Sequence, residues 1–407
     1  MLAQSSLQAA LVYWDSDGAV AGGSADTMAT GNWGGASAST FWSPSALGDA
    51  ATTATWNTAD TAVFAAGTDV TGAYTVTLGA AQTAAGLNVE EGTVSLAGSA
   101  LTVGAGTVVI ESGAKLSIPS TSNLIATAGA SMNLNGGTFR NMVNGAGSIF
   151  LDLDFTINVG ALGGTLETAN TGTNSSIFSG PIKGVGNTLF KTGSGEFRFN
   201  GVNRGTTTYA KLQVDQGLFR LGNVNDFNFE TGFGAAPAAF LSDAIKLSNG
   251  GAIGASFLIT LHNNRGITLG TGGGAFNTST GQMTVPGAIT GTGTLSKNTA
   301  GILNLSGNSD YSGATLVTAG TLQVGSANAL GSTAGNTQIS ASSEVQFDGA
   351  AGGSVATPEP FQIAGGWARR DHRRPKHPKH CKCGDWGASN AGRKCHCICY
   401  RILDGSI

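Results

Sequence analysis

The strongest constraint on the fold is an internal repeat. Residues 285–331 repeat the pattern of residues 182–227, about a hundred positions earlier, with a loop three residues shorter in the later copy. The matched pairs are Leu189 and Leu295, Lys191 and Lys297, Gly195 and Gly301, Phe197 and Leu303, Phe199 and Leu305, Gly201 and Gly307, Gly217 and Gly320, Phe219 and Leu322, Leu221 and Val324, Gly222 and Gly325, and Asn225 and Asn328. Matches at a constant spacing predict one structural unit used more than once.

Each copy is built from short runs in which apolar and polar residues alternate. A period of two is typical of a strand with one buried face, and Gly or Asn at the breaks supplies turns with positive φ. Weaker versions of this pattern occupy residues 72–79, 84–118 and 131–143. The best candidate for a short helix is the stretch 236–246, APAAFLSDAIK.

Short strands with no long loops between them could form a sandwich, a propeller or a solenoid. Separations of only about four to ten residues favour coils stacked along one axis, in which each strand pairs in parallel with the strand of the next coil. The sequence therefore predicts an all-β solenoid body over residues 66–366, and its clearest coils are the two repeats.

Tryptophan marks the first 65 residues as different from this body. Trp14, Trp33, Trp42 and Trp56 lie there, whereas residues 66–366 contain no tryptophan. Because the open end of a solenoid exposes strand edges, we expect residues 1–65 to form an aromatic-rich N-terminal cap. The alternative is that these rings are exposed and stack against sugars.

Charge and cysteine content narrow the function classes. Residues 1–366 contain eleven Lys and Arg against 21 Asp and Glu, and no cysteine, which argues against nucleic-acid binding and suits an exported protein. No apolar stretch is long enough for a transmembrane helix. The first residues lack the pattern of a signal peptide, so we expect the true start to lie upstream.

The second repeat resembles the autotransporter-associated β-strand repeat of bacterial surface proteins. The matching positions are Leu303, Leu305, Gly307, Asn308, Tyr311, Gly313, Thr315, Gly320, Leu322, Val324, Gly325, Asn328, Leu330 and Gly331. This resemblance implies a right-handed parallel β-helix and a structural or adhesive passenger at the cell surface, with surface glycans or other cells as partners. It also implies a signal peptide and a C-terminal membrane β-barrel. Neither is visible here, so we expect a fragment whose membrane association depends on missing parts.

The repeat body offers few residues for chemistry. A β-helix that binds or degrades polysaccharide is the alternative function, and it would need carboxylates such as Asp152 with Asp154 or Glu90 with Glu91. We interpret Asp152 and Asp154 as an outward polar face, and His262 as a turn or rung-edge residue. We predict no enzyme activity and assign no catalytic, cofactor-binding or metal residue.

Residues 367–407 form a basic tail rich in Cys and His, with ten Lys and Arg against three Asp and Glu. Its candidate zinc ligands are His380, Cys381, Cys383, Cys395, His396, Cys397 and Cys399. A metal-binding tail is therefore a second alternative, but a C-x-C spacing suits zinc poorly. A reading-frame shift near residue 366 would turn Cys codons into Val or Ala and restore the repeat pattern. We predict that the tail is frameshifted and disordered.

Overall fold

The computed structural model describes residues 10–18, 20–24, 28–34, 41–51, 56–119, 124–126, 129–142, 149–151, 156–169, 175–178, 180–200, 207–222, 230–347, 355, 357–363, 380–383 and 397–400. These residues form β-strands and one 3-10 helix, η2 (Glu230–Phe233). None of the described helical structure is long and apolar enough to cross a membrane. The chain divides into two compact units, Met1–Ala210 and Lys211–Ile407.

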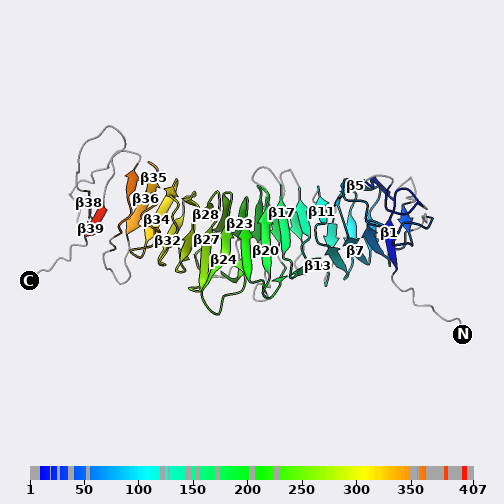
Figure 1. The fold of residues 1–407 in the computed structure, drawn as a ribbon, viewed down its shortest axis with the longest axis horizontal. Coiled ribbons are helices and arrows are strands. Elements are labelled where there is room, and N and C mark those ends of the chain that lie inside the picture. The colour runs from blue at the N-terminus through cyan, green and yellow to red at the C-terminus, as the bar shows by residue number, and fades with distance from the viewer. Residues whose placement is uncertain are drawn as a thin grey trace, which may run out of the picture. The chain divides into compact units, whose positions relative to one another are not determined.

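In the first unit the strands form ladders in which each strand pairs with its counterpart one coil later (Figure 1). One ladder runs β3 (Trp42–Ser43), β1 (Leu11–Trp14), β4 (Thr61–Phe64), β7 (Gly86–Val89), β10 (Thr107–Ile110), β13 (Ser131–Leu134), β16 (Thr156–Val159), β19 (Ile182–Lys183). A second runs β2 (Gly31–Trp33), β5 (Ala73–Leu78), β8 (Thr93–Gly98), β11 (Lys115–Ile118), β14 (Thr138–Asn141), β17 (Gly164–Thr168), β20 (Thr188–Thr192). The third side consists of β6 (Gln82–Ala84), β9 (Leu101–Val103) and β12 (Leu124–Ala126), and of β15 (Ile149–Leu151), β18 (Ser175–Phe178) and β21 (Glu196–Phe199).

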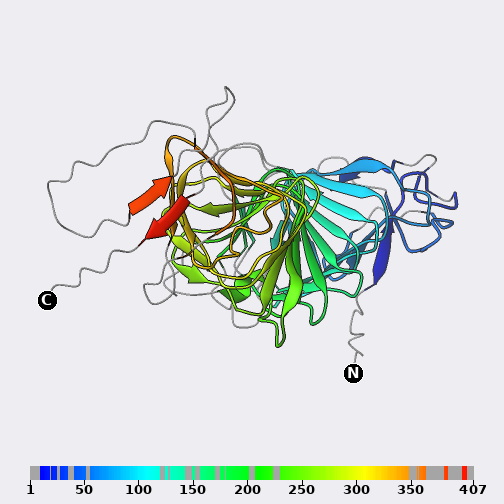
Figure 2. The ribbon, with the colours of Figure 1, turned by 60° about the vertical axis from the view of Figure 1, so that its left-hand side comes forward.

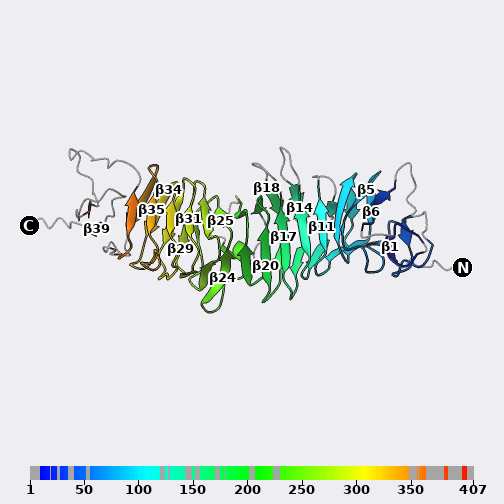
Figure 3. The ribbon, with the colours of Figure 1, turned by 45° about the horizontal axis from the view of Figure 1, so that its top comes forward.

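The second unit has three ladders of the same kind (Figures 2 and 3). The first ladder contains β22 (Lys211–Val214), β24 (Leu241–Leu247), β27 (Arg265–Leu269) and β30 (Ile289–Gly291). The second contains β23 (Leu218–Leu221), β25 (Gly251–Ala255), β28 (Gly274–Thr278), β31 (Leu295–Lys297), β33 (Thr315–Val317), β35 (Thr337–Ile339) and β37 (Phe361–Ile363). The third contains β26 (Ile259–Thr260), β29 (Gln282–Val285), β32 (Ile302–Leu305), β34 (Gly320–Val324) and β36 (Ser343–Phe347).

The core of each unit is a set of stacked inward side chains. In the first unit Val94, Leu116, Phe139 and Leu166 occupy one register position of successive coils, and all four are buried. Their neighbours along each strand point outward and are polar or only partly buried, as the period of two requires. The predicted all-β solenoid with parallel stacked strands is confirmed.

The helix expected at residues 236–246 is wrong. The second half of that stretch belongs to β24, which pairs in parallel with β22 and β27. Ile245 occupies an inward register position between Leu212 and Ile267. Stacking in the apolar core therefore overrides the local helix preference of the Ala-rich segment.

Candidate functional site

The tryptophans of the N-terminal segment form a cluster inside the first unit. Trp14, Trp33 and Trp42 are at most 1% exposed. Trp42 meets Trp14 and Trp33 edge to face, with ring centroids 5.1 and 4.9 Å apart, and Trp56 lies 4.8 Å from Trp33. Such edge-to-face pairs add to the stabilisation from burial. Three of the four rings therefore have no face available for a sugar, which contradicts the sugar-stacking alternative for them.

The same segment covers the first coil of the unit. β1 pairs in parallel with β4, and β3 pairs antiparallel with the other edge of β1, between Tyr13 and Ser43 and between Trp14 and Trp42. An antiparallel strand at this edge interrupts the parallel ladder. The N-terminal segment thus joins the sheets of the solenoid rather than forming a separate body.

The repeat lysine of the first copy is buried in the apolar core. Lys191 follows Leu166 in the inward register and its side chain is fully buried. Its Nζ donates to the carbonyl oxygens of Thr192 at 2.7 Å and Gly193 at 2.8 Å. Burial lowers the pKa of Lys191 to about 7, and the charge of Glu167 opposes part of that change.

The repeat lysine of the second copy makes the same turn contact. Lys297 lies between Phe276 and Val317 in the inward register and is fully buried. Its Nζ donates to the carbonyl oxygen of Thr299, and to that of Ala319 at 3.1 Å. Burial lowers the pKa of Lys297 to about 8.

Sequence reasoning matched these two lysines as repeat positions but gave them no role. The signal was available, because each lysine stands two residues after an apolar inward residue, Leu189 or Leu295. A period of two therefore places both side chains in the core. They act as structural donors that satisfy turn carbonyls, since a buried carbonyl without a donor is costly.

The outer face of the second ladder of the first unit carries stacked charges. Glu167 pairs with Lys115 at 2.7 Å and with Arg140 at 3.0 Å, across three successive coils. On the neighbouring ladder the amide of Asn158 donates to Asn133 at 2.8 Å. These side chains satisfy one another, so they describe a polar, paired surface rather than a reactive centre.

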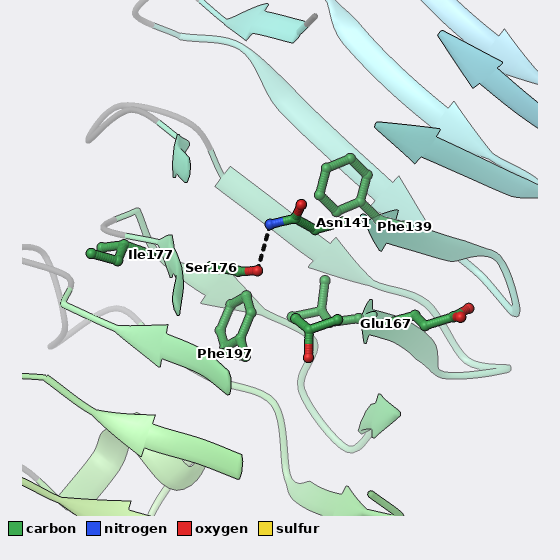
Figure 4. Close-up of a pocket in the computed structure, with 8 residues that line it drawn as sticks. Phe139, Asn141, Glu167, Ser176, Ile177 and Phe197 are labelled. Carbon is green, nitrogen blue, oxygen red and sulfur yellow. Dashed lines mark hydrogen bonds between the residues drawn. The ribbon is translucent and has the colours of Figure 1, made fainter. Parts of the chain in front are cut away.

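A small pocket opens beside this face (Figure 4). Asn141 donates to Ser176 there at 2.5 Å, and both side chains are buried. The remaining lining includes the aromatic rings of Phe139 and Phe197. With about 10 Å³ of space, the pocket has room for about one water molecule and none for a sugar ring.

The candidate residues from the sequence fall in different places. His262 is exposed in the turn after β26, where its Nδ1 accepts from the backbone N–H of Asn264 at 3.2 Å. Glu90 accepts from the amide of Asn88 at 3.0 Å, and Glu91 from the backbone N–H of Val70 at 2.9 Å. Burial raises the pKa of both glutamates, and neighbouring acids add to the rise.

The carboxylate pair Asp152 and Asp154 lies outside the described residues. Within the part of the chain that the structure describes, no group of three or more His, Cys, Asp or Glu side chains is placed to hold a metal ion. Among the described candidates of the repeat body, only the sequence neighbours Glu90 and Glu91 lie next to each other.

Of the tail, the structure describes only β38 (His380–Cys383) and β39 (Cys397–Tyr400), which pair antiparallel. The register sets Cys381 opposite Cys399 and Cys383 opposite Cys397. Cys395 and His396 lie outside the described residues. The frameshift and the disorder expected for residues 367–407 stay predictions.

Comparison with known proteins agrees with the repeat. The passenger-associated transport repeat family matches residues 295–324, the stretch from β31 to β34. The adhesin BmaC autotransporter of Brucella suis biovar 1 (strain 1330) is 36% identical over 102 residues, which are 25% of this chain and 3% of the adhesin. The chain thus spans a small part of that relative. No solved structure matches it significantly.

The matched residues form β31 and β33 of the second ladder and β32 and β34 of the third ladder. They include the buried Lys297 and its turn. The solenoid fold, the repeat match and the adhesin similarity all agree with a resemblance to autotransporter passengers. The chain is a repeat protein that resembles autotransporter passengers over part of its length.

Proposed function

We propose that this chain is a structural or adhesive segment of a passenger that a Gram-negative bacterium displays on its surface or secretes. The observation that carries the proposal is the match of the passenger-associated transport repeat to residues 295–324, which form stacked coils. Stacked parallel coils of this kind present their outer side chains and loops to whatever the passenger contacts. No catalysis is required for this role.

The outer surface supports a contact role better than a reactive one. Several of its described charges are paired, as in Lys115 with Glu167, and the described pocket is too small for a sugar ring. The partners we propose are surface glycans or other cells.

The test uses beads coated with the full chain. We expect the beads to bind epithelial cells or immobilised glycans more than albumin-coated beads do, and we expect no reducing sugar ends to be released from neutral or acidic glycans. Release of sugar ends would contradict the proposal in favour of a polysaccharide-degrading enzyme. Absence of binding would remove the adhesive role, and rapid proteolysis of the repeats would remove the structural one.

A further inference from the structure

Two carboxylates in the loop after β1 lack donors for most of their oxygens. The Asp15 side chain is fully buried, and its Oδ1 accepts from the backbone N–H groups of Asp17 at 3.1 Å and Gly18 at 2.9 Å. Its Oδ2 is buried with no hydrogen-bond donor among the described residues. Both carboxylate oxygens of Asp17 are likewise buried with no hydrogen-bond donor among the described residues.

Three buried carboxylate oxygens without donors would be costly if both groups were ionised, because a buried charge needs a partner. The two groups also interact with each other. Burial is the main cause that raises the pKa of Asp15 to about 6, and Asp17 adds to the rise. Either the pair shares a proton or a cation from solution lies between them.

The sequence around the pair offers no positive side chain. Residues 1–114 contain no Lys, Arg or His. The acidic residues in this stretch are Asp15, Asp17, Asp26, Asp49, Asp60, Asp69, Glu90, Glu91 and Glu111. The first basic side chain, Lys115, is paired with Glu167. No side chain of residues 1–114 can therefore neutralise the pair.

The donor set selects the class of cation. Carboxylate and carbonyl oxygens are hard ligands that suit Ca²⁺, whereas zinc sites draw on Cys and His. The first histidine of the chain is His262 and the first cysteine is Cys381, both far along the sequence. Two carboxylates match the charge of one divalent ion, and water and backbone oxygens can complete its shell.

We propose that Asp15 and Asp17 bind a divalent cation, Ca²⁺, in the loop that follows β1. The ion takes Asp15 Oδ2 and the carboxylate of Asp17 as ligands and leaves the turn bonds of Asp15 Oδ1 intact. With only two carboxylates, the dissociation constant is expected at about 0.1–1 mM, as in weak extracellular sites. Since Trp14 immediately precedes Asp15, binding also fixes the loop against the tryptophan cluster.

The position next to Trp14 provides a direct probe. Tb³⁺ can replace Ca²⁺ in oxygen sites, and excitation of a nearby tryptophan makes bound Tb³⁺ emit. With the full chain we expect tryptophan-sensitised Tb³⁺ emission that Ca²⁺ removes by competition, and a rise of the melting temperature on addition of millimolar Ca²⁺.

Asp17→Asn is the main variant, because no described hydrogen bond depends on its carboxylate, and Asp15→Asn is the second, since Asn keeps an acceptor for the turn. Each should weaken Ca²⁺ competition at least tenfold. Asp49→Asn is the control, an exposed acid of the same segment that bonds to Ser45, and it should bind as the wild type does.

Wild-type affinity in Asp17→Asn would overturn the proposal, as would Tb³⁺ emission that Ca²⁺ does not reduce. A chain that binds neither ion but gains stability as pH falls below 6 would show the other solution, a proton shared by the two carboxyl groups.

Discussion

The two copies of the repeat bury the same lysine against the same turn but surround it differently. Lys191 Nζ donates to Gly193 O and Lys297 Nζ to Thr299 O, which are equivalent positions of the repeat. Lys297 also bonds to Ala319, one coil further on. The pKa falls to about 7 for Lys191 and to about 8 for Lys297. The repeat thus fixes the turn contact, whereas neighbouring coils set the environment of the ammonium group.

The copies also differ in the side of the coil that they occupy. In the second unit, β22 and β23 of the first copy belong to the first and second ladders, whereas β33 and β34 of the second copy belong to the second and third. The turns between them are alike, since Gly217 and Gly320 have φ of 66° and 71°. One sequence pattern therefore builds one kind of turn on different sides of the solenoid.

The largest expected effect is the pH dependence that Lys191 adds. The folded chain releases this proton near pH 7, while the unfolded chain holds it up to about pH 10.5. The unfolded state binds more protons in this window, so stability rises with pH, by up to about 5 kcal/mol. Lys191→Met should remove that rise, measured as the difference from wild type in urea unfolding followed by circular dichroism at pH 7, 8.5 and 10.

Lys183→Met is the matched control, because Lys183 is an exposed lysine of β19 in the same unit. It should keep the rise of the wild type. An unchanged alkaline slope in Lys191→Met would mean that the ammonium is solvated, and the burial argument would fail for the first copy.

Lys297→Met should remove a smaller rise of stability with pH than Lys191→Met does. The folded chain releases the Lys297 proton near pH 8, whereas the unfolded chain holds it up to about pH 10.5. The free energy of unfolding should therefore rise by up to about 3 kcal/mol between these two pH values. The same titration of urea midpoints measures it. A loss as large as that of Lys191→Met would show that the two environments do not differ.

Gly320→Ala tests the turn that the copies share. Gly320 has a φ of 71°, and an added Cβ would lie too close to the backbone oxygens of Thr299 and Gly301. Strain and clash together should lower the free energy of unfolding by more than about 2 kcal/mol. Gly250→Ala is the control, since Gly250 has a φ of 76° and open space around the Cβ position, and it should cost about 1 kcal/mol. Equal losses in urea melts would show that the clash relaxes.

Tyr311→Phe should give the smallest effect. The Tyr311 hydroxyl and the Thr315 hydroxyl are buried and 2.6 Å apart, in the part of the second copy where the loop is shorter. Loss of the bond should cost about 1–2 kcal/mol. The double variant with Thr315→Val should recover part of it, because no hydroxyl is then left without a partner. If the double variant has a urea midpoint no higher than that of Tyr311→Phe, the hydrogen bond between the two hydroxyls does not stabilise the fold.

Much of the fold followed from short-range pattern. Period-two alternation predicted strands such as β32 and β34, and constant spacing predicted that they stack in parallel. Short-range pattern gave the wrong element for the stretch 236–246. Nothing within this Ala-rich segment indicates that Ile245 stacks on Ile267 of the next coil. The N-terminal tryptophans predicted a cap, but their burial depends on how the segments fold over one another.

The sequence by itself determined the strand period, the glycine turns and the inward position of both repeat lysines, because these depend on neighbours within a few residues. Only the tertiary structure decided which side of the coil each copy occupies and which carbonyls each lysine reaches. It also left Asp15 Oδ2 and both carboxylate oxygens of Asp17 buried without donors among the described residues. Those features depend on residues one coil away, and the spacing between coils is set by turns whose lengths vary.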